Sequence, residues 1–199
     1  MEAFITLYLK LFFMMTPFFV LSVFLIMGKN LMRYEKRKII LKLGIAVIVA
    51  SLIFLIFGQY IFNLFGITLD AFKIGAGTVL FLSALEMIKG QSEIPDANNK
   101  HEGDFAIVPL AIPITVGPGM IGILMVMGAE IETVSDVLVI SASLITAVVS
   151  LMLVLLISNK IQRLLGPQGL EILPKITGLF VSAIGAQIVF SGINGFIAM

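Results

Sequence analysis

The chain has 199 residues, of which 59% are hydrophobic and 13% are charged, and its formal net charge is +1. An average soluble domain is about one quarter charged, so this composition excludes a soluble globule and indicates a protein embedded in lipid. The balanced charge also excludes the clustered basic surface of a nucleic-acid-binding protein. With no cysteine and a single histidine, His101, we expect no metal site and no cofactor.

Apolar runs long enough to cross a bilayer recur along the chain. A membrane-spanning helix needs about 20 apolar residues, and the sequence predicts an all-α integral membrane protein with six such helices. We expect them at residues 11–28, 43–69, 70–89, 105–129, 137–159 and 176–199. The third is the least regular, because Lys73 and Glu86 flank its short charge-free core. A lysine near a helix end can nevertheless extend to the membrane interface.

Basic residues are distributed unevenly between the two sides that six spans define. The loops expected at 29–42, 89–104 and 159–175 hold all but two of the 13 Lys and Arg residues, and the other side holds only Lys10 and Lys73. The positive-inside rule places the basic side in the cytoplasm. We therefore expect a multi-pass protein of the cytoplasmic (inner) membrane with both termini outside.

The two halves of the chain resemble each other weakly. Residues 45–66 align with 145–166 without a gap, and residues 73–90 align with 175–192. In the second alignment the small residues coincide at intervals of seven, which marks one helix face where another helix can approach closely. These residues are Ala76, Ser83 and Gly90 in the first half and Gly178, Gly185 and Gly192 in the second.

Polarity at the helix ends suggests that the second half is turned over relative to the first. The uncharged Gln59 and Asn63 correspond to Asn159 and the basic Arg163, as expected if the two segments end on opposite sides of the membrane. The sequence thus predicts two inverted three-helix repeats, residues 1–90 and 105–199, joined by a cytoplasmic linker at 91–104. The alternative is that the halves share only hydrophobic periodicity.

Helices one and four, which begin the two halves, each carry a helix breaker near mid-membrane. The first contains Thr16-Pro17, and the second contains Thr115 followed by Gly117-Pro118-Gly119. Proline removes a backbone donor and clashes with the preceding turn, and glycine permits non-helical dihedrals. In a bilayer, unwound backbone is tolerated only where protein buries it or where it lines a cavity. We therefore predict that residues 115–119 are unwound and that the two broken helices form a binding site between the halves. The alternative for Pro17 is a single kink that only bends its helix.

The chemistry of such a site suits a small zwitterion. A helix that restarts after Pro118 directs free N–H groups and its positive end toward a carboxylate. Open carbonyls of the preceding half-helix and the hydroxyls of Thr16 and Thr115 could accept from an ammonium group.

These motifs resemble the MarC family of inner-membrane proteins, which includes the archaeal small neutral amino acid transporters called SnatA. Residues 109–121 read PLAIPITVGPGMI and carry most of the resemblance, with weaker similarity at 71–77 and 175–178. The resemblance implies six spans and, for SnatA-like members, uptake of glycine and alanine coupled to a proton or sodium gradient. The family often has Asn-Pro where this chain has Thr16-Pro17, and Arg where it has Lys73 and Lys175, so the identity of the substrate is open.

The leading hypothesis is a secondary active transporter of small neutral amino acids that works by alternating access. The alternatives are a drug or metabolite exporter, which the family's association with antibiotic resistance implies, and a structural membrane protein that transports nothing. No phosphate-binding loop or catalytic constellation occurs, so we expect no enzyme. The expected partners are a zwitterionic amino acid and the lipid bilayer, with a possible homo-oligomer and no nucleic acid.

Ten residues are candidates for the site. The substrate-binding candidates are Thr16, Pro17, Thr115, Gly117, Pro118, Gly119 and Gln187. The candidates for gating or coupling are Lys73, Lys175 and Glu86. For each lysine the alternative is an anchor that extends to lipid headgroups. For Gln187 it is an ordinary interhelical hydrogen bond, and for Glu86 a pair with Lys89. We expect Asp70, Glu130, Glu132 and Asp136 to be solvated residues of the outer loops.

Overall fold

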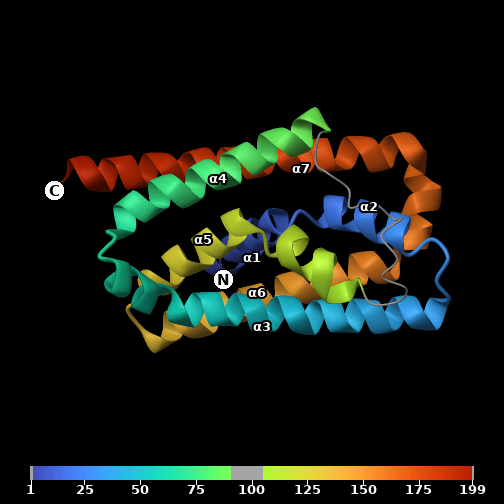
Figure 1. Ribbon diagram of the computed structural model, residues 1–199, viewed down its shortest axis with the longest axis horizontal. Coiled ribbons are helices and arrows are strands. Elements are labelled where there is room, and N and C mark those ends of the chain that lie inside the picture. The colour runs from blue at the N-terminus through green and yellow to red at the C-terminus, as the bar shows by residue number, and fades with distance from the viewer. Residues whose placement is uncertain (1, 91–104, 199) are drawn as a thin grey trace.

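The computed structural model describes residues 2–90 and 105–198, so the predicted linker at 91–104, which includes His101, lies outside the described residues. The described residues form helices and no β-strand (Figure 1). The elements are α1 (Glu2–Met14), α2 (Pro17–Met27), α3 (Arg33–Phe65), α4 (Leu69–Lys89), the π-helix η1 (Ala106–Thr115), α5 (Pro118–Ala129), α6 (Val134–Leu156) and α7 (Ser158–Ile197).

Five or six of the described segments could cross a membrane. Five helical segments are long and apolar enough, and one of them, Phe4–Met27, combines α1 and α2. The bent pair η1 and α5 is the sixth candidate. The prediction of an all-α protein with membrane-spanning helices is therefore confirmed.

Two long helices extend well beyond their predicted spans. α3 begins at Arg33, although we expected the span to begin at residue 43, and α7 begins at Ser158 rather than at 176. The loops predicted at 29–42 and 159–175 are therefore largely helical. Lys and Arg are good helix formers, so a change from apolar to basic sequence marks the edge of the bilayer and not the end of a helix. Within α7 the chain turns at Gly166, whose φ of 64° is left-handed and lies directly before Pro167.

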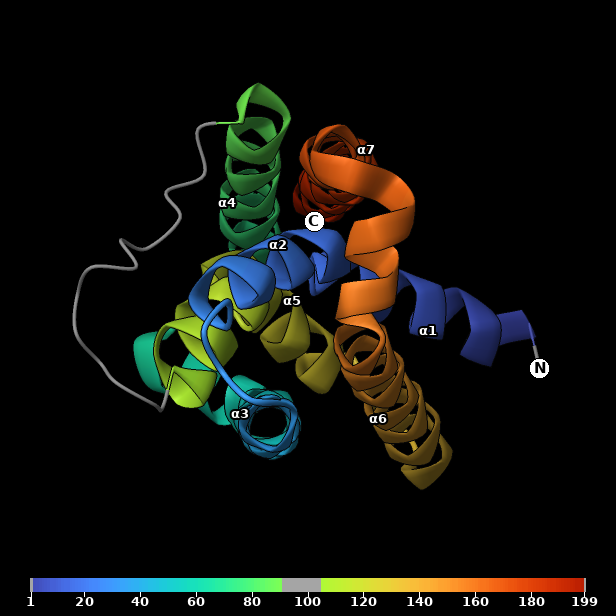
Figure 2. The same ribbon diagram turned by 90° about the vertical axis from the view of Figure 1, so that its right-hand side faces the viewer.

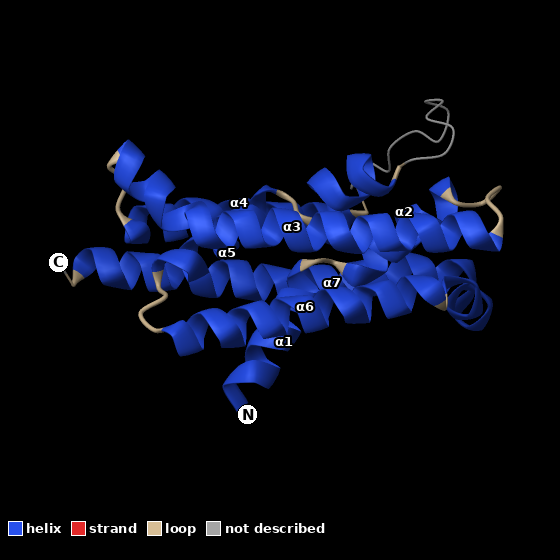
Figure 3. Ribbon diagram, turned by 90° about the horizontal axis from the view of Figure 1, so that it is seen from below, coloured by secondary structure: helices blue, strands red, loops and turns tan. Residues whose placement is uncertain are grey.

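Most of the helices run along one axis of the molecule, and α1 runs across it (Figure 3). The long helices stack in three layers (Figure 2). α4 and α7 lie on one side and α3 and α6 on the other, with α2 and α5 between them (Figure 2). α3 and α4 both pack on α5, and α3 also packs on η1. Likewise α6 packs on α1, and α7 packs on α2. α3 and α4, from the first half of the chain, therefore enclose η1 and α5. In the same way α6 and α7, from the second half, enclose α1 and α2.

α4 and α7 pack antiparallel through small residues. A Cβ added at Gly178 would lie 2.9 Å from the Ala84 carbonyl oxygen, and one at Gly192 would lie 2.7 Å from that of Asp70. Between these two contacts, a Cβ at Gly77 would lie 2.9 Å from the carbonyl oxygen of Gly185. The predicted face of small residues is thus the contact face of α7, and glycine there allows the two backbones to approach.

We expect Gly77→Ala to lower the free energy of unfolding by about 1–3 kcal/mol, because the added methyl group overpacks a contact with backbone atoms. The matched control is Gly75→Ala on the same helix, where an added Cβ has no neighbour within 4 Å. Unfolding in mixed micelles, followed by circular dichroism, measures both variants. Equal stability of the two variants would contradict the proposed close contact of α4 and α7.

Candidate functional site

The first helix break lies between α1 and α2. Pro17 is the first residue of α2, and its ring prevents α1 from continuing through this position. The intervening Thr16 is left-handed, with φ 48° and ψ 57°, and is the only non-glycine residue with positive φ in the described part of the chain. The carbonyl oxygens of Leu11 and Phe13 accept from the backbone N–H groups of Met15 and Thr16, and the break leaves those of Phe12 and Met14 without intrahelical donors.

The second break lies between η1 and α5, which are bent by 67° relative to each other. It is shorter than we predicted, because only Val116 and Gly117 are non-helical and Pro118 already belongs to α5. Proline fits the first turn of a helix, where its missing N–H has no intrahelical acceptor in any case. The α-helix expected before this break is instead a π-helix with extended residues at Val108 and Ile112, each of which precedes a proline and is thereby disfavoured in α-helical dihedrals.

A cavity of about 220 Å³ lies between the two breaks. We call it the break cavity. Six of the predicted site residues line it: Thr16, Glu86, Thr115, Gly117, Pro118 and Gly119. α4 contributes Leu80, Ser83, Ala84 and Met87 as well, and α7 contributes Val181. Pro17 is buried beside Thr16 and is not part of the lining. The structure therefore brings most of the predicted substrate-binding residues together.

The polar groups of the break cavity come from the side chains of Thr16, Ser83, Glu86 and Thr115 and from the backbone at the breaks. Gly117 cannot cap α5 with a side chain, so the first N–H groups of α5, at Gly119 and Met120, have no acceptor within their own helix. They lie at the positive end of the helix. The buried hydroxyl of Thr115 donates to the Leu110 carbonyl oxygen at 2.7 Å, which leaves its own oxygen available as an acceptor. The cavity thus offers donors for a carboxylate and acceptors for an ammonium group.

A second and larger cavity, of about 550 Å³, does not include residues of either break. We call it the charged cavity. Its polar lining consists of Lys10, Lys73, Glu130, Ser135, Asp136, Gln187 and Ser191. Gln187, which we expected at the substrate site, therefore lies here, away from the break residues.

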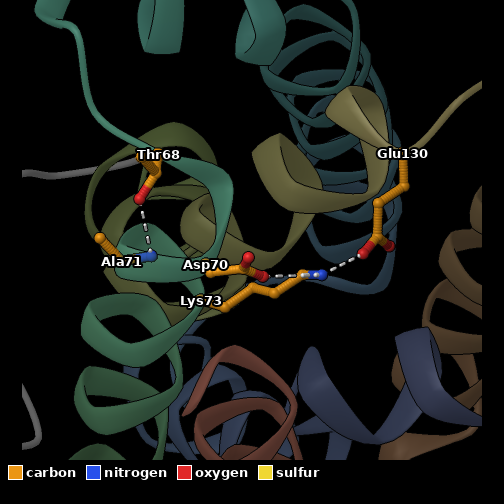
Figure 4. A network of polar contacts seen from close by, with 5 residues as sticks. All are labelled: Thr68, Asp70, Ala71, Lys73 and Glu130. Atoms are coloured by element: carbon orange, nitrogen blue, oxygen red, sulfur yellow. Dashed lines mark hydrogen bonds and ion pairs between the residues drawn. The ribbon is translucent and has the colours of Figure 1, made fainter. Parts of the chain in front are cut away.

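Lys73 forms an ion pair that links α4 to the end of α5 (Figure 4). Its ammonium nitrogen lies 2.6 Å from Glu130 Oε1 and 3.8 Å from Asp70 Oδ1. The side chain of Lys73 is only 14% exposed, whereas that of Glu130 is 48% exposed. Asp70, which we expected to be a solvated loop residue, is only 19% exposed and lies in the first turn of α4, whereas Glu130 is solvated as expected and also contacts Lys73.

The other two gating candidates have weaker connections. Lys175 pairs with Glu171 at 2.8 Å, four residues earlier on the same helix, so this ion pair does not join different helices. Glu86 is exposed and lines the break cavity. It forms no ion pair with Lys89 or with any other residue in the described ranges.

Several polar lining residues were not predicted as part of a site. Ser83 was noted only as a small residue, and it lines the break cavity. Lys10 was placed outside the membrane, but it lies within the candidate span Phe4–Met27, and the apolar residues before it were the available signal. Glu130 carried no such signal, because its partner is distant in the sequence.

Comparisons with known proteins agree along the whole chain. The family model described as "MarC family integral membrane protein" matches residues 1–197. A UPF0056 membrane protein of Methanocaldococcus jannaschii is 31% identical over 98% of each chain. One of Pyrococcus abyssi is 30% identical over 98% of this chain and 96% of its own, and YhcE of Escherichia coli is 26% identical over 94% and 90%. No solved structure matches the chain.

The left-handed backbone at Thr16 generates a prediction about stability. A β-branched residue is strained there, by about 1–2 kcal/mol, whereas asparagine tolerates this conformation. We expect Thr16→Asn to raise the free energy of unfolding by about 1 kcal/mol, and Thr16→Val, which keeps the β-branch, to give no increase. Chemical unfolding in micelles compares the two, and equal values would show that the break is not strained.

Proposed function

The chain belongs to the MarC family of integral membrane proteins, and from this premise we propose that it is a secondary active transporter of small neutral amino acids. The substrates proposed are glycine and alanine, carried across the cytoplasmic membrane. The names of these relatives describe them as membrane proteins and give no substrate, so the proposal depends on the site.

The break cavity carries the proposal. Pockets for drug-sized ligands measure about 300–1,000 Å³, and this cavity, at about 220 Å³, is smaller. At about 30 Å³ per water molecule it has room for roughly seven waters, which suits an amino acid of five or six non-hydrogen atoms. The free N–H groups of α5 are suited to the substrate carboxylate, and Thr115 and the carbonyl of Met14 at the end of α1 are suited to its ammonium group.

The packing supports the proposal that the halves are inverted repeats. The break at Thr16 and the break at Val116 lie at equivalent places in the two halves. α4 and α7, which are equivalent in the alignment, pack antiparallel, as an inverted pair requires. In such transporters, rocking of one half against the other exposes a central site to each side in turn.

Orientation and ion coupling belong to the same proposal. The basic residues near the start of α3 and the start of α7 favour a cytoplasmic location for that end, with both termini outside. The charged cavity then lies on the outer side, where Lys73 and Glu130 connect the end of α5 to α4. We propose that this ion pair acts as an outer gate and that a proton or sodium gradient supplies the driving force.

The exporter alternative has one observation in its favour. The charged cavity, at about 550 Å³, lies within the range for drug-sized ligands. Its lining includes two lysines and two carboxylates, however, whereas a pocket for a bulky ligand is predominantly apolar and aromatic. We therefore interpret it as a vestibule for a small zwitterion.

Purified protein in sealed liposomes tests the proposed function. We expect accumulation of radiolabelled glycine and alanine, faster with an imposed proton or sodium gradient than without one. Accumulation of drug-like cations and of neither amino acid would favour the exporter, and no flux of any of these would favour a structural role.

A matched pair of variants tests the site within the same assay. Thr115→Val keeps the shape of the side chain but removes the acceptor oxygen, and we expect about tenfold weaker glycine binding. Thr177→Val is the control, because Thr177 is equally buried and its hydroxyl also donates to a carbonyl of its own helix, but it does not line the break cavity. Equal affinity of the two variants would contradict the site assignment. Gly119 is a poor target, since an added Cβ there would lie 2.9 Å from the Leu80 Cα and disturb packing.

The outer gate generates a separate prediction. Lys73→Ala removes an ion pair between helices, so it should favour the state open on that side. Because Glu130 is half exposed, we expect an effect of about 1 kcal/mol or less. The chain contains no cysteine, so labelling of Ser83→Cys from each side reports the opening.

Lys175→Ala is the comparison variant, because this substitution removes only the exposed ion pair with Glu171 on the same helix. We expect a smaller change in labelling for this variant than for Lys73→Ala. An equal pattern in both variants and in the parent would identify both lysines as headgroup anchors.

A further inference from the structure

A third cavity lies at the end of the bundle where α3 begins and α6 ends. It measures about 360 Å³ and is separate from the break cavity and the charged cavity. Basic side chains from two distant parts of the sequence line it: Arg33, Lys36, Arg37, Lys160 and Arg163. We call it the basic cavity. α3 supplies three of these side chains, and the first turns of α7 supply the other two.

No carboxylate lines the basic cavity, and none of its five basic side chains has an ion pair with a residue that the structure describes. The acidic residue nearest in sequence is Glu35, which is not part of the lining. Its carboxylate accepts a hydrogen bond from the Met32 backbone at 2.7 Å and so caps the start of α3. Five like charges that share one cavity repel each other, and an anion within the cavity would remove this repulsion.

An apolar surface continues from the basic cavity along α3. A neighbouring groove of about 530 Å³ shares Arg33 and Arg37 with it and adds Tyr34, Lys38 and Leu41. Beyond Leu41, exposed apolar side chains recur every four residues, which places them on one face of the helix. These are Leu41, Ile45, Val49 and Ile53, with exposed fractions of 56%, 56%, 51% and 48%.

We propose that the basic cavity binds the phosphate headgroup of an anionic phospholipid from the surrounding bilayer, with its acyl chains along the exposed face of α3. Basic pockets on the cytoplasmic side of helical membrane proteins are suited to such headgroups. A soluble phosphate compound would satisfy the five charges but would not cover Tyr34, Leu41 and the apolar face beyond them. The lipid bridges α3 in the first half of the chain and the start of α7 in the second, so it links the two halves at this end of the bundle.

Titration of the purified full chain in neutral detergent with phosphatidylglycerol, followed by native mass spectrometry and thermal unfolding, tests the proposal. We expect phosphatidylglycerol to bind and to raise the unfolding temperature, and phosphatidylcholine to do neither. Arg37→Gln with Arg163→Gln should weaken phosphatidylglycerol binding about tenfold or more. Both side chains are exposed, so this double variant is expected to fold.

The control variant is Lys29→Gln with Lys89→Gln, which removes the same net charge from exposed positions that do not line the basic cavity. We expect it to bind phosphatidylglycerol like the parent chain. If both double variants bound phosphatidylglycerol equally weakly, the loss of binding would be due to net charge alone, and this result would overturn the proposed site. Inorganic phosphate that binds as tightly as the lipid would overturn the lipid assignment in favour of a soluble anion. If the arginine variant unfolds on purification, Arg163→Gln alone is titrated against Lys29→Gln with the same two outcomes.

Discussion

The requirement that backbone polar groups find partners inside a bilayer determines the arrangement of this protein. Each unsatisfied group in hydrocarbon costs several kcal/mol, about the size of a typical folding free energy. Two breaks in membrane-spanning segments are therefore tolerated only if other helices enclose them. α3 and α4 enclose η1 and α5, while α6 and α7 enclose α1 and α2. Enclosure in this way produces the break cavity, so the constraint on folding also generates the candidate site.

Close contact between backbones makes this enclosure possible. α5 is buried from Gly122 to Gly128, and its glycines face α3 and α4 directly: Gly122 contacts Ala76, and Gly128 contacts the backbone of Leu55. Larger residues would separate these helices and open the breaks to lipid. Stability at the glycine contacts and the shape of the break cavity therefore depend on the same interhelical distances.

The sequence predicted the features that depend on local chemistry. Apolar runs predicted the spans, the breakers at Thr16-Pro17 and Gly117-Pro118 predicted where two of them are interrupted, and small residues predicted the contact face of α7. It failed where the result depends on tertiary contacts. Lys73 and Glu130 are distant in the sequence, and only the packing of α4 on α5 brings them together. Gln187 lies six residues beyond Val181 on α7, and only Val181 reaches the break cavity, so the level of Gln187 along the bundle could not be predicted from the sequence.

The two lysines that the alignment of the halves pairs, Lys73 and Lys175, have different partners. Lys73 joins two helices, whereas Lys175 pairs within α7. Under the inverted-repeat proposal, the two halves have equivalent folds but need not adopt the same conformation at one time, and exchange of their conformations produces the state open to the opposite side. Unequal lysine pairs are then a consequence of one such state, in which the end of the bundle near Lys73 is held by an ion pair between helices. The opposite end has no comparable link among the described residues, and an anionic lipid between α3 and α7 would supply one there.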